Sequence, residues 1–277
     1  MPDLAVSNIA LTAFDHGAEI DRLGDFGLIG LEVAPSRVWR DTWHGLAATD
    51  VDRYRRRIEA AGLRGIGLHS LFFDHPGLGL FKEPEVRAET QDFLVHLSAM
   101  CRDLGGRTLI YGGGRKRGAV GVEAAFAETV DFFGELCQRI EGHGTCFCLE
   151  PLSPRETDFI HSVFDALAVV KAVNHVALRM QLDAKALVAN GEATAEPFRA
   201  AAADLVHFHA NEPGLAVLGT SGTVDHAAFG QFLRDVGYRG FVSVEQRHLN
   251  PEDPIGDIAK SVAVLKRCYL QEADGNQ

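Results

Sequence analysis

Short apolar runs alternate with longer amphipathic segments along the whole chain. The apolar runs are typical of buried strands, which we expect at Ser7–Thr12, Gly30–Ala34, Arg64–His69, Arg107–Tyr111, Thr145–Glu150, Val176–Leu182, Leu205–His209 and Phe241–Glu245. The segments between them repeat their apolar positions at helical spacing. Phe126, Val130 and Phe133, for example, share one face of the segment Glu123–Glu141. Regular alternation of strands and helices predicts a parallel sheet.

Residues that favour helix ends support this division of the chain. Thr49 or Asp50, Ser162 and Asp225 are typical N-caps, and Pro84 suits a first helical turn. The expected helices are Glu19–Phe26, Val51–Ala61, Pro84–Leu104, Glu123–Glu141, 163–173, Ala195–Ala202, 226–236 and Pro254–Leu270. The polar tail Glu272–Gln277 is expected to fray.

The number of these units indicates the fold class. Eight strand–helix units follow one another in about 270 residues, without a linker or low-complexity tract. A doubly wound open sheet is the alternative, but it usually has fewer strands. We therefore expect residues 1–277 to form one domain, a single (β/α)8 TIM barrel.

Composition and net charge limit which binding partners and which cellular location we expect. With 27 Lys and Arg against 38 Asp and Glu, the net charge of −11 opposes binding to nucleic acid. Five cysteines without CxxC spacing favour reduced thiols rather than a disulfide framework. The sequence has neither a signal-peptide pattern nor a run of about 18 apolar residues. We expect a cytoplasmic protein that binds neither nucleic acid nor membrane.

Four consecutive strands of the expected barrel end in a residue that can bind a metal. These residues are Glu150 before Pro151, Asp183 after Leu182, His209, and Glu245. The C-terminal ends of parallel barrel strands meet on one face, so the four side chains should converge. Three carboxylates close together would repel one another, and a divalent cation would relieve that repulsion. One imidazole and three carboxylates suit Mn²⁺, Mg²⁺, Co²⁺ or Zn²⁺.

Each of these residues also has a simpler explanation. An acid at a strand end is commonly a helix cap or part of a surface ion pair, and a strand histidine is commonly a hydrogen-bonded core residue. The coincidence on four consecutive strands favours the metal site. Strand periodicity agrees, because His207 shares a face with His209, and Cys148 shares one with Glu150.

The motifs around these residues resemble a known family. The run from Glu150 to Glu156 (EPLSPRE), Leu182-Asp183, His207-Phe208-His209 and Val244-Glu245 are similar to motifs of the xylose-isomerase-like TIM barrel superfamily of sugar phosphate isomerases and epimerases. Within it, the chain most resembles the D-tagatose/D-psicose 3-epimerase branch. The similarity follows the whole chain in order, but its specific motifs lie in the C-terminal half.

This resemblance implies a mechanism and an assembly. The metal ligands of the branch fall on Glu150, Asp183, His209 and Glu245, with Mn²⁺ as the expected ion, and its substrate-binding glutamate falls on Glu156. Glu150 and Glu245 would remove and return the proton next to the carbonyl of a keto-sugar through an enediolate. The resemblance also suggests a homodimer or homotetramer that acts on a small sugar or sugar derivative.

The chain departs from that branch at three positions near the site. Ala186 replaces a substrate-binding histidine, Leu215 replaces an arginine, and Ser153 replaces an asparagine. A free sugar as substrate therefore does not follow from the resemblance. A metal-dependent lyase or dehydratase that acts on a keto-inositol or keto-sugar derivative is the alternative.

Four further residues are candidates for binding the substrate. His69 ends a strand, Lys185 follows Asp183, and Arg247 shares strand parity with Glu245. Arg115 lies in the loop Gly112–Gly118, where glycines and three cations suit a phosphate or carboxylate. Each has an alternative: a hydrogen-bonded core histidine for His69, and a solvated surface position for the three cations.

Two further classes of function are less well supported. An endonuclease IV-like enzyme for abasic DNA would need more histidines at the strand ends, and the first two strands supply none. A binding protein without catalytic activity would be expected to have lost at least one ligand of the set. The complete set favours an enzyme.

Overall fold

Eight parallel strands form a closed barrel in the computed structural model, which describes residues 1–270. Each strand pairs with the next in sequence, and β8 pairs with β1, where Ser243 lies opposite Ala5. The strands are β1 (Asp3–Ser7), β2 (Gly30–Val33), β3 (Arg64–Leu68), β4 (Thr108–Tyr111), β5 (Cys146–Leu149), β6 (Leu178–Asp183), β7 (Leu205–Ala210) and β8 (Phe241–Val244). This closure confirms the predicted (β/α)8 TIM barrel.

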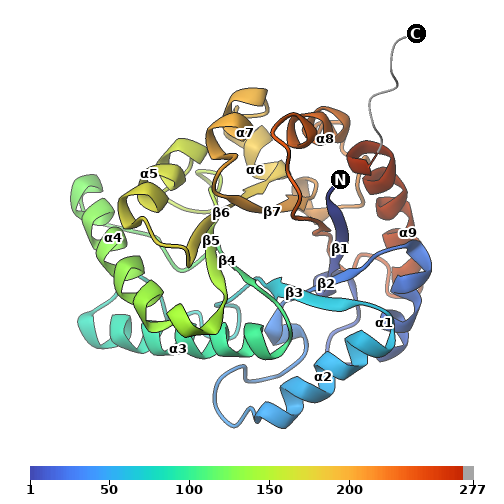
Figure 1. The fold of residues 1–277 in the computed structure, drawn as a ribbon, viewed down its shortest axis with the longest axis horizontal. Coiled ribbons are helices and arrows are strands. Elements are labelled where there is room, and N and C mark those ends of the chain that lie inside the picture. Colours follow the sequence, from blue (N-terminus) through green and yellow to red (C-terminus); the bar gives the residue numbers. More distant parts are fainter. Residues whose placement is uncertain (271–277) are drawn as a thin grey trace.

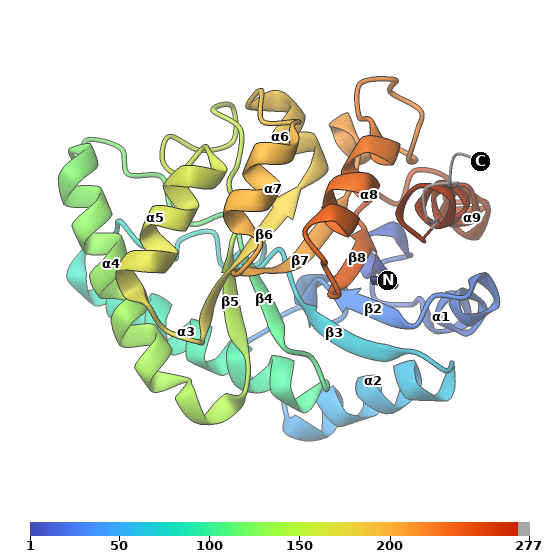
Figure 2. The same cartoon turned by 45° about the horizontal axis from the view of Figure 1, so that its top comes forward.

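Helices surround the barrel (Figure 1). They are α1 (Gly17–Leu23), α2 (Ala48–Ala60), α3 (Pro84–Asp103), α4 (Val122–Arg139), α5 (Val163–Val173), α6 (Ala184–Ala189), α7 (Ala195–Ala201), α8 (His226–Asp235) and α9 (Pro254–Leu265). Helix α9 packs beside α1, so the last helix completes the ring against the first (Figure 2). Among residues 1–270, no helix combines the length and the apolar character needed to cross a bilayer.

The two faces of the sheet are buried in different surroundings. Outward-facing side chains pack against the helices, and Tyr111 on β4 meets Phe133 of α4 edge to face. The interior of the barrel instead contains buried polar residues: Ser7, Glu32, Gln181, His207, His209 and Ser243. A buried polar group is costly without a partner, and several of these side chains have one: Ser243 and His209 bond to Glu32, Gln181 bonds to Glu150, and Ser7 bonds to His69.

The expected elements are largely present, with three corrections. The first strand is Asp3–Ser7 rather than Ser7–Thr12, because Ser7 accepts a hydrogen bond from the N–H of Ile9 and starts a short 3-10 turn. The N-cap of α2 is Ala47, and Asp50 accepts from its N–H from within the first turn. The short helix α6 was not expected at all.

Other predicted caps are confirmed. Ser162 accepts from the N–H of Asp165 at 3.0 Å, and Asp225 accepts from that of Ala228 at 2.9 Å. Pro84 is the first residue of α3. The remaining bounds differ by a few residues, as is usual for element ends. The predicted fraying of Glu272–Gln277 lies outside the described residues.

Candidate active site

The four predicted ligands converge at the C-terminal ends of β5 to β8. The side chains of Glu150, Asp183 and His209 each offer an atom within 4.8 Å of the others. From His209 Nδ1, the distance is 3.9 Å to Glu150 Oε1, 3.9 Å to Asp183 Oδ2 and 3.6 Å to Glu245 Oε2. Three carboxylates therefore face one imidazole nitrogen from three sides.

His209 is held in one orientation by its other nitrogen. Its Nε2 lies 3.0 Å from Oε2 of Glu32, which is fully buried at the centre of β2. A carboxylate only accepts, so Nε2 carries the proton of this hydrogen bond. Nδ1 is buried and has no hydrogen-bond partner among the described residues. In the neutral ring it presents a lone pair to the three acids.

Asp183 and Glu245 are linked through Asn211. The Nδ2 of Asn211 donates to Asp183 Oδ2 at 2.5 Å and to Glu245 Oε2 at 2.7 Å. The other oxygen of Asp183 accepts from the N–H of Ala186 at 2.7 Å and caps α6. Asn211 was not among the site residues predicted from the sequence, although its position two residues after His209 is a recognisable signal.

Glu150 reaches the site across Gly112. Its Oε1 accepts from Gln181 Nε2 at 3.2 Å. A Cβ at Gly112 would overlap the Glu150 carboxylate, so a glycine is required there. The first glycine of the loop Gly112–Gly118 thus makes room for a protein carboxylate, rather than for the bound anion that we had considered.

The crowding of these acids shifts their proton affinities in opposite directions. Burial, with the nearby charge of Asp183, raises the pKa of Glu150 to about 8. Burial also raises the pKa of Asp183. Burial alone would raise the pKa of Glu245, but His209, His69 and Asn211 together lower it to about 2. Burial opposes charge on His209 as well, yet Glu32 and Glu245 raise its pKa to about 10. Without a cation, the cluster relieves its repulsion by holding protons.

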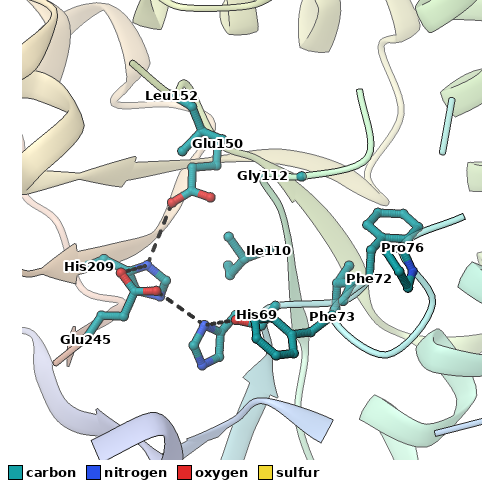
Figure 3. A pocket seen from close by; sticks show the side chains of 13 residues that line it. His69, Phe72, Phe73, Pro76, Ile110, Gly112, Glu150, Leu152, His209 and Glu245 are labelled. Atoms are coloured by element: carbon teal, nitrogen blue, oxygen red, sulfur yellow. Dashed lines mark hydrogen bonds and ion pairs between the residues drawn. The ribbon is translucent and has the colours of Figure 1, made fainter. Parts of the chain in front are cut away.

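A cavity of about 460 Å³ opens directly above this cluster. Glu150, His209 and Glu245 lie on one side of it, and His69 and Phe73 lie on another (Figure 3). His69 is buried, with Nε2 2.5 Å from Ser7 Oγ and Nδ1 3.5 Å from Glu245 Oε1. His69 therefore contacts a predicted ligand as well as this space, which we call the central cavity.

Two other predicted substrate residues form an ion pair at the rim. Lys185 Nζ lies 2.7 Å from Glu156 Oε1, and Ser153 Oγ donates to Glu156 Oε2 at 2.7 Å. Burial lowers the tendency of Lys185 to hold a proton, but Asp183 and Glu156 outweigh it and raise the Lys185 pKa. The ammonium group is thus neutralised by protein acids.

Arg115 lies inside the protein rather than in the cavity. It is 2% exposed, and its guanidinium donates to the carbonyl oxygens of Tyr111, Gly112, Glu150, Phe159 and Ile160. A guanidinium has five N–H donors, and these five carbonyls account for its capacity. This placement contradicts the expected substrate contact of Arg115; it shapes the backbone beneath Glu150 instead.

Arg247 is exposed after β8 and lines a second cavity that also touches Glu245. The structure therefore brings eight of the nine sequence-predicted site residues to the central cavity, its rim or its neighbour, and turns Arg115 away. Glu32, which bonds His209, is a second site residue besides Asn211 that was not predicted from the sequence.

Comparison with protein families agrees with this architecture. The family model described as xylose isomerase-like TIM barrel matches residues 20–268. The chain belongs to this family.

Several known epimerases are similar to this chain. D-psicose 3-epimerase of Ruminiclostridium cellulolyticum is 29% identical over 117 residues, which are 42% of this chain and 40% of that enzyme. The crystal structure of D-psicose 3-epimerase with D-tagatose from Clostridium cellulolyticum H10 superposes with a TM-score of 0.80 at 18% identity, over 97% of this chain and 98% of the other. The 3-keto-D-glucoside 4-epimerase of E. coli gives 0.80 at 18% identity, over 97% and 100%.

Proposed function

We propose that the protein is a divalent-metal-dependent isomerase or epimerase that moves a proton next to the carbonyl group of a keto-sugar or related polyol. One observation carries the proposal: the buried, unpartnered Nδ1 of His209 faces Glu150, Asp183 and Glu245. Similarity to D-psicose 3-epimerase and to 3-keto-D-glucoside 4-epimerase supports the class of reaction.

The donor set fits a divalent cation. Glu150, Asp183, His209 and Glu245 would supply one imidazole nitrogen and three carboxylate groups, a set that suits Mn²⁺, with Mg²⁺, Co²⁺ and Zn²⁺ as alternatives. The bond from His209 Nε2 to Glu32 is the outer-shell contact that metal-bound histidines usually make. A bound ion would supply positive charge that makes the proton next to the substrate carbonyl more acidic.

Two of these acids also serve as the proposed acid and base. Glu150 comes from β5 and Glu245 from β8, strands that are not neighbours in the barrel, so they can approach a substrate from different sides. One takes the proton from carbon and the other returns it. His69 and Asn211 fix the Glu245 carboxylate, and Gln181 fixes that of Glu150.

Other residues would bind and orient the sugar. Glu156 and Lys185 lie together at the rim of the site, where hydroxyl groups can bond to both. His69 borders the central cavity directly, and Arg247 borders the adjoining one. Arg115 acts by supporting the backbone at Glu150. The cytoplasmic location and the homodimer or homotetramer stay predictions from the sequence.

Proton exchange tests the proposal. The Mn²⁺-loaded protein is incubated in D₂O with a panel of ketoses, 3-keto-glycosides and keto-inositols, and deuterium next to the carbonyl is followed by NMR. We expect incorporation together with inversion at that carbon. Incorporation with loss of water, or with cleavage, would instead indicate the lyase or dehydratase. No exchange with any compound of the panel would refute the proposal.

A further inference from the structure

A second cavity of about 430 Å³ adjoins the central one beside Glu245. The two cavities share Ser70, Phe73 and Glu245. Arg37, Arg247 and His248 line the second one but not the central one, and we call the second one the arginine cavity. A molecule with its carbonyl between Glu150 and Glu245 could therefore extend into it.

The arginine cavity is basic although the chain carries a net charge of −11. None of the ion pairs among residues 1–270 includes Arg37 or Arg247. Glu19 lies close enough to Arg37 to influence its pKa, but both Glu19 oxygens accept hydrogen bonds from Thr12. The cations of this cavity thus lack a dedicated protein counter-ion.

Two nitrogen atoms there also lack a hydrogen-bond partner among residues 1–270. Arg37 Nη2 donates to the carbonyl of Leu11 at 2.6 Å, whereas its Nε is buried with no partner among the described residues. His248 Nε2 is buried without a partner as well. A buried N–H group without a partner destabilises the protein, so a ligand whose oxygen atoms accept hydrogen bonds from these nitrogens should bind more tightly.

Glu245, the one acid among the described residues that line the cavity, is already engaged. Glu245 bonds to Asn211 and lies beside His69 and His209. The planar guanidinium group matches carboxylate and phosphate oxygens, with which it forms paired hydrogen bonds. We propose that the arginine cavity binds a carboxylate or phosphate at one end of the substrate, so that the substrate is an anionic ketose. This inference rests on the proposed function.

The opposite end of the site is less suited to an anion. Lys185 is neutralised by Glu156, and Arg115 is committed to backbone carbonyls. Lys82 and Lys116 line a third cavity of about 300 Å³ at that end, but both are exposed, and exposed charges attract an anion only weakly. The arginine cavity instead contains the buried Nε of Arg37, which has no partner among the described residues, so we place the anion there.

The backbone holds Arg247 at this cavity. Its N–H donates to the carbonyl of Leu215 at 2.9 Å, and both residues line the arginine cavity. The loop after β8 therefore carries a guanidinium beside the loop after β7. Arg37 adds a second cation.

The test compares neutral with anionic ketoses of the same chain length. D-Fructose, D-fructose 6-phosphate and D-fructuronate are titrated calorimetrically into the Mn²⁺-loaded protein and into the variants Arg247→Met and Arg37→Met. Arg239→Met is the matched control, because Arg239 is an exposed arginine just before β8, at the opposite end of the barrel. Thermal melts verify that each variant is folded.

We expect the wild-type protein to bind at least one anionic ketose at least about tenfold more tightly than D-fructose, as charged hydrogen bonds worth about 1.5–3 kcal/mol predict. Arg247→Met should remove most of this preference, Arg37→Met part of it, and Arg239→Met none. The two anionic compounds distinguish phosphate from carboxylate.

Two results would overturn the inference. One is equal affinity for neutral and anionic ketoses. The other is an equal loss of preference in Arg239→Met and Arg247→Met, which would indicate only a long-range effect of charge. A different result would show that the proposed function is wrong although the anion site exists. In that case binding of the anionic ketoses would still depend on Arg247, but no ketose would exchange the proton next to its carbonyl.

Discussion

Replacing Glu32 by glutamine should weaken metal binding while the barrel stays folded. The Glu32 carboxylate lies under the site, and its oxygens are 3.0 Å from His209 Nε2, 3.1 Å from His207 Nε2 and 2.7 Å from Ser243 Oγ. Burial opposes its charge, but His207, His209 and His69 lower the Glu32 pKa well below its usual range. An ionised Glu32 makes the His209 ring a better electron donor at Nδ1.

The size of the effect follows from this contact. Glutamine keeps the shape and one acceptor oxygen, but it removes the negative charge, and its N–H group cannot accept the proton that His209 Nε2 donates. Loss of an outer-shell partner typically weakens metal binding about 10- to 100-fold. This range corresponds to about 1.4–2.7 kcal/mol.

Calorimetric titration of the metal-free protein with Mn²⁺ measures the affinity without relying on turnover. Ser243→Ala is the matched control, because it removes one hydrogen bond to Glu32 and leaves the carboxylate in place. We expect less than about a threefold change there, because the charge of Glu32 remains and Ser243 acts on His209 only indirectly. Circular dichroism and a thermal melt verify the fold of both variants.

The reasoning fails if folded Glu32→Gln binds Mn²⁺ within twofold of the wild-type protein. It also fails if Ser243→Ala loses as much affinity as Glu32→Gln. In either case the charge of Glu32 would not act through His209, and its contact with the ring would be only part of core packing.

Three further outcomes are expected. Glu245→Gln should lower deuterium exchange into the substrate at least about 100-fold by NMR with near-UV circular dichroism unchanged; wild-type exchange would remove Glu245 from the mechanism. Chelation should abolish deuterium exchange, and addition of Mn²⁺ at about 100 times its Kd should restore it. The same Mn²⁺ concentration should raise the free energy of unfolding by about 2.7 kcal/mol. Full activity after exhaustive dialysis against chelator would contradict this prediction. Burial lowers the pKa of His16 from 6.5, so the unfolded chain binds the proton first and stability should fall as pH drops below that value. His16→Gln should reduce this slope in denaturant melts by up to about 1.4 kcal/mol per pH unit, and an unchanged slope would show that His16 does not contribute.

The sequence predicted the barrel because its signals are local. Each buried strand is a short apolar run, and Ser162, Asp225 and Pro84 mark helix starts by their own chemistry. The convergence of the ligand set followed from topology, since parallel strands bring their C-terminal ends to one face. The first strand was placed wrongly because residues 7–12 are as apolar as residues 3–7, and hydrophobicity alone did not reveal the turn that Ser7 begins.

The rest depended on contacts across the barrel. Glu32 stands in the middle of an apolar run, and an acid there signals a buried partner, but nothing nearby in sequence identifies His207 or His209. Arg115 looked like a ligand-binding cation because sequence does not reveal whether a loop arginine faces inward. Its carbonyl partners belong to segments that meet only in the folded chain.

Asp183 and His209 each use one side-chain atom to bond to the surrounding protein and direct another toward the proposed metal site. Asp183 uses one oxygen to cap α6, and His209 uses one nitrogen to bond Glu32, while the other atom of each turns toward a shared space. Side chains anchored in this way cannot separate to relieve their repulsion, so they must take up protons or gather around a cation. A bound cation relieves the repulsion among the carboxylates that folding has brought together, and this relief contributes to its affinity. The contribution depends on the hydrogen bonds that hold the ligands in place, so a substitution at Glu32, which is not itself a ligand, should lower the affinity for the metal.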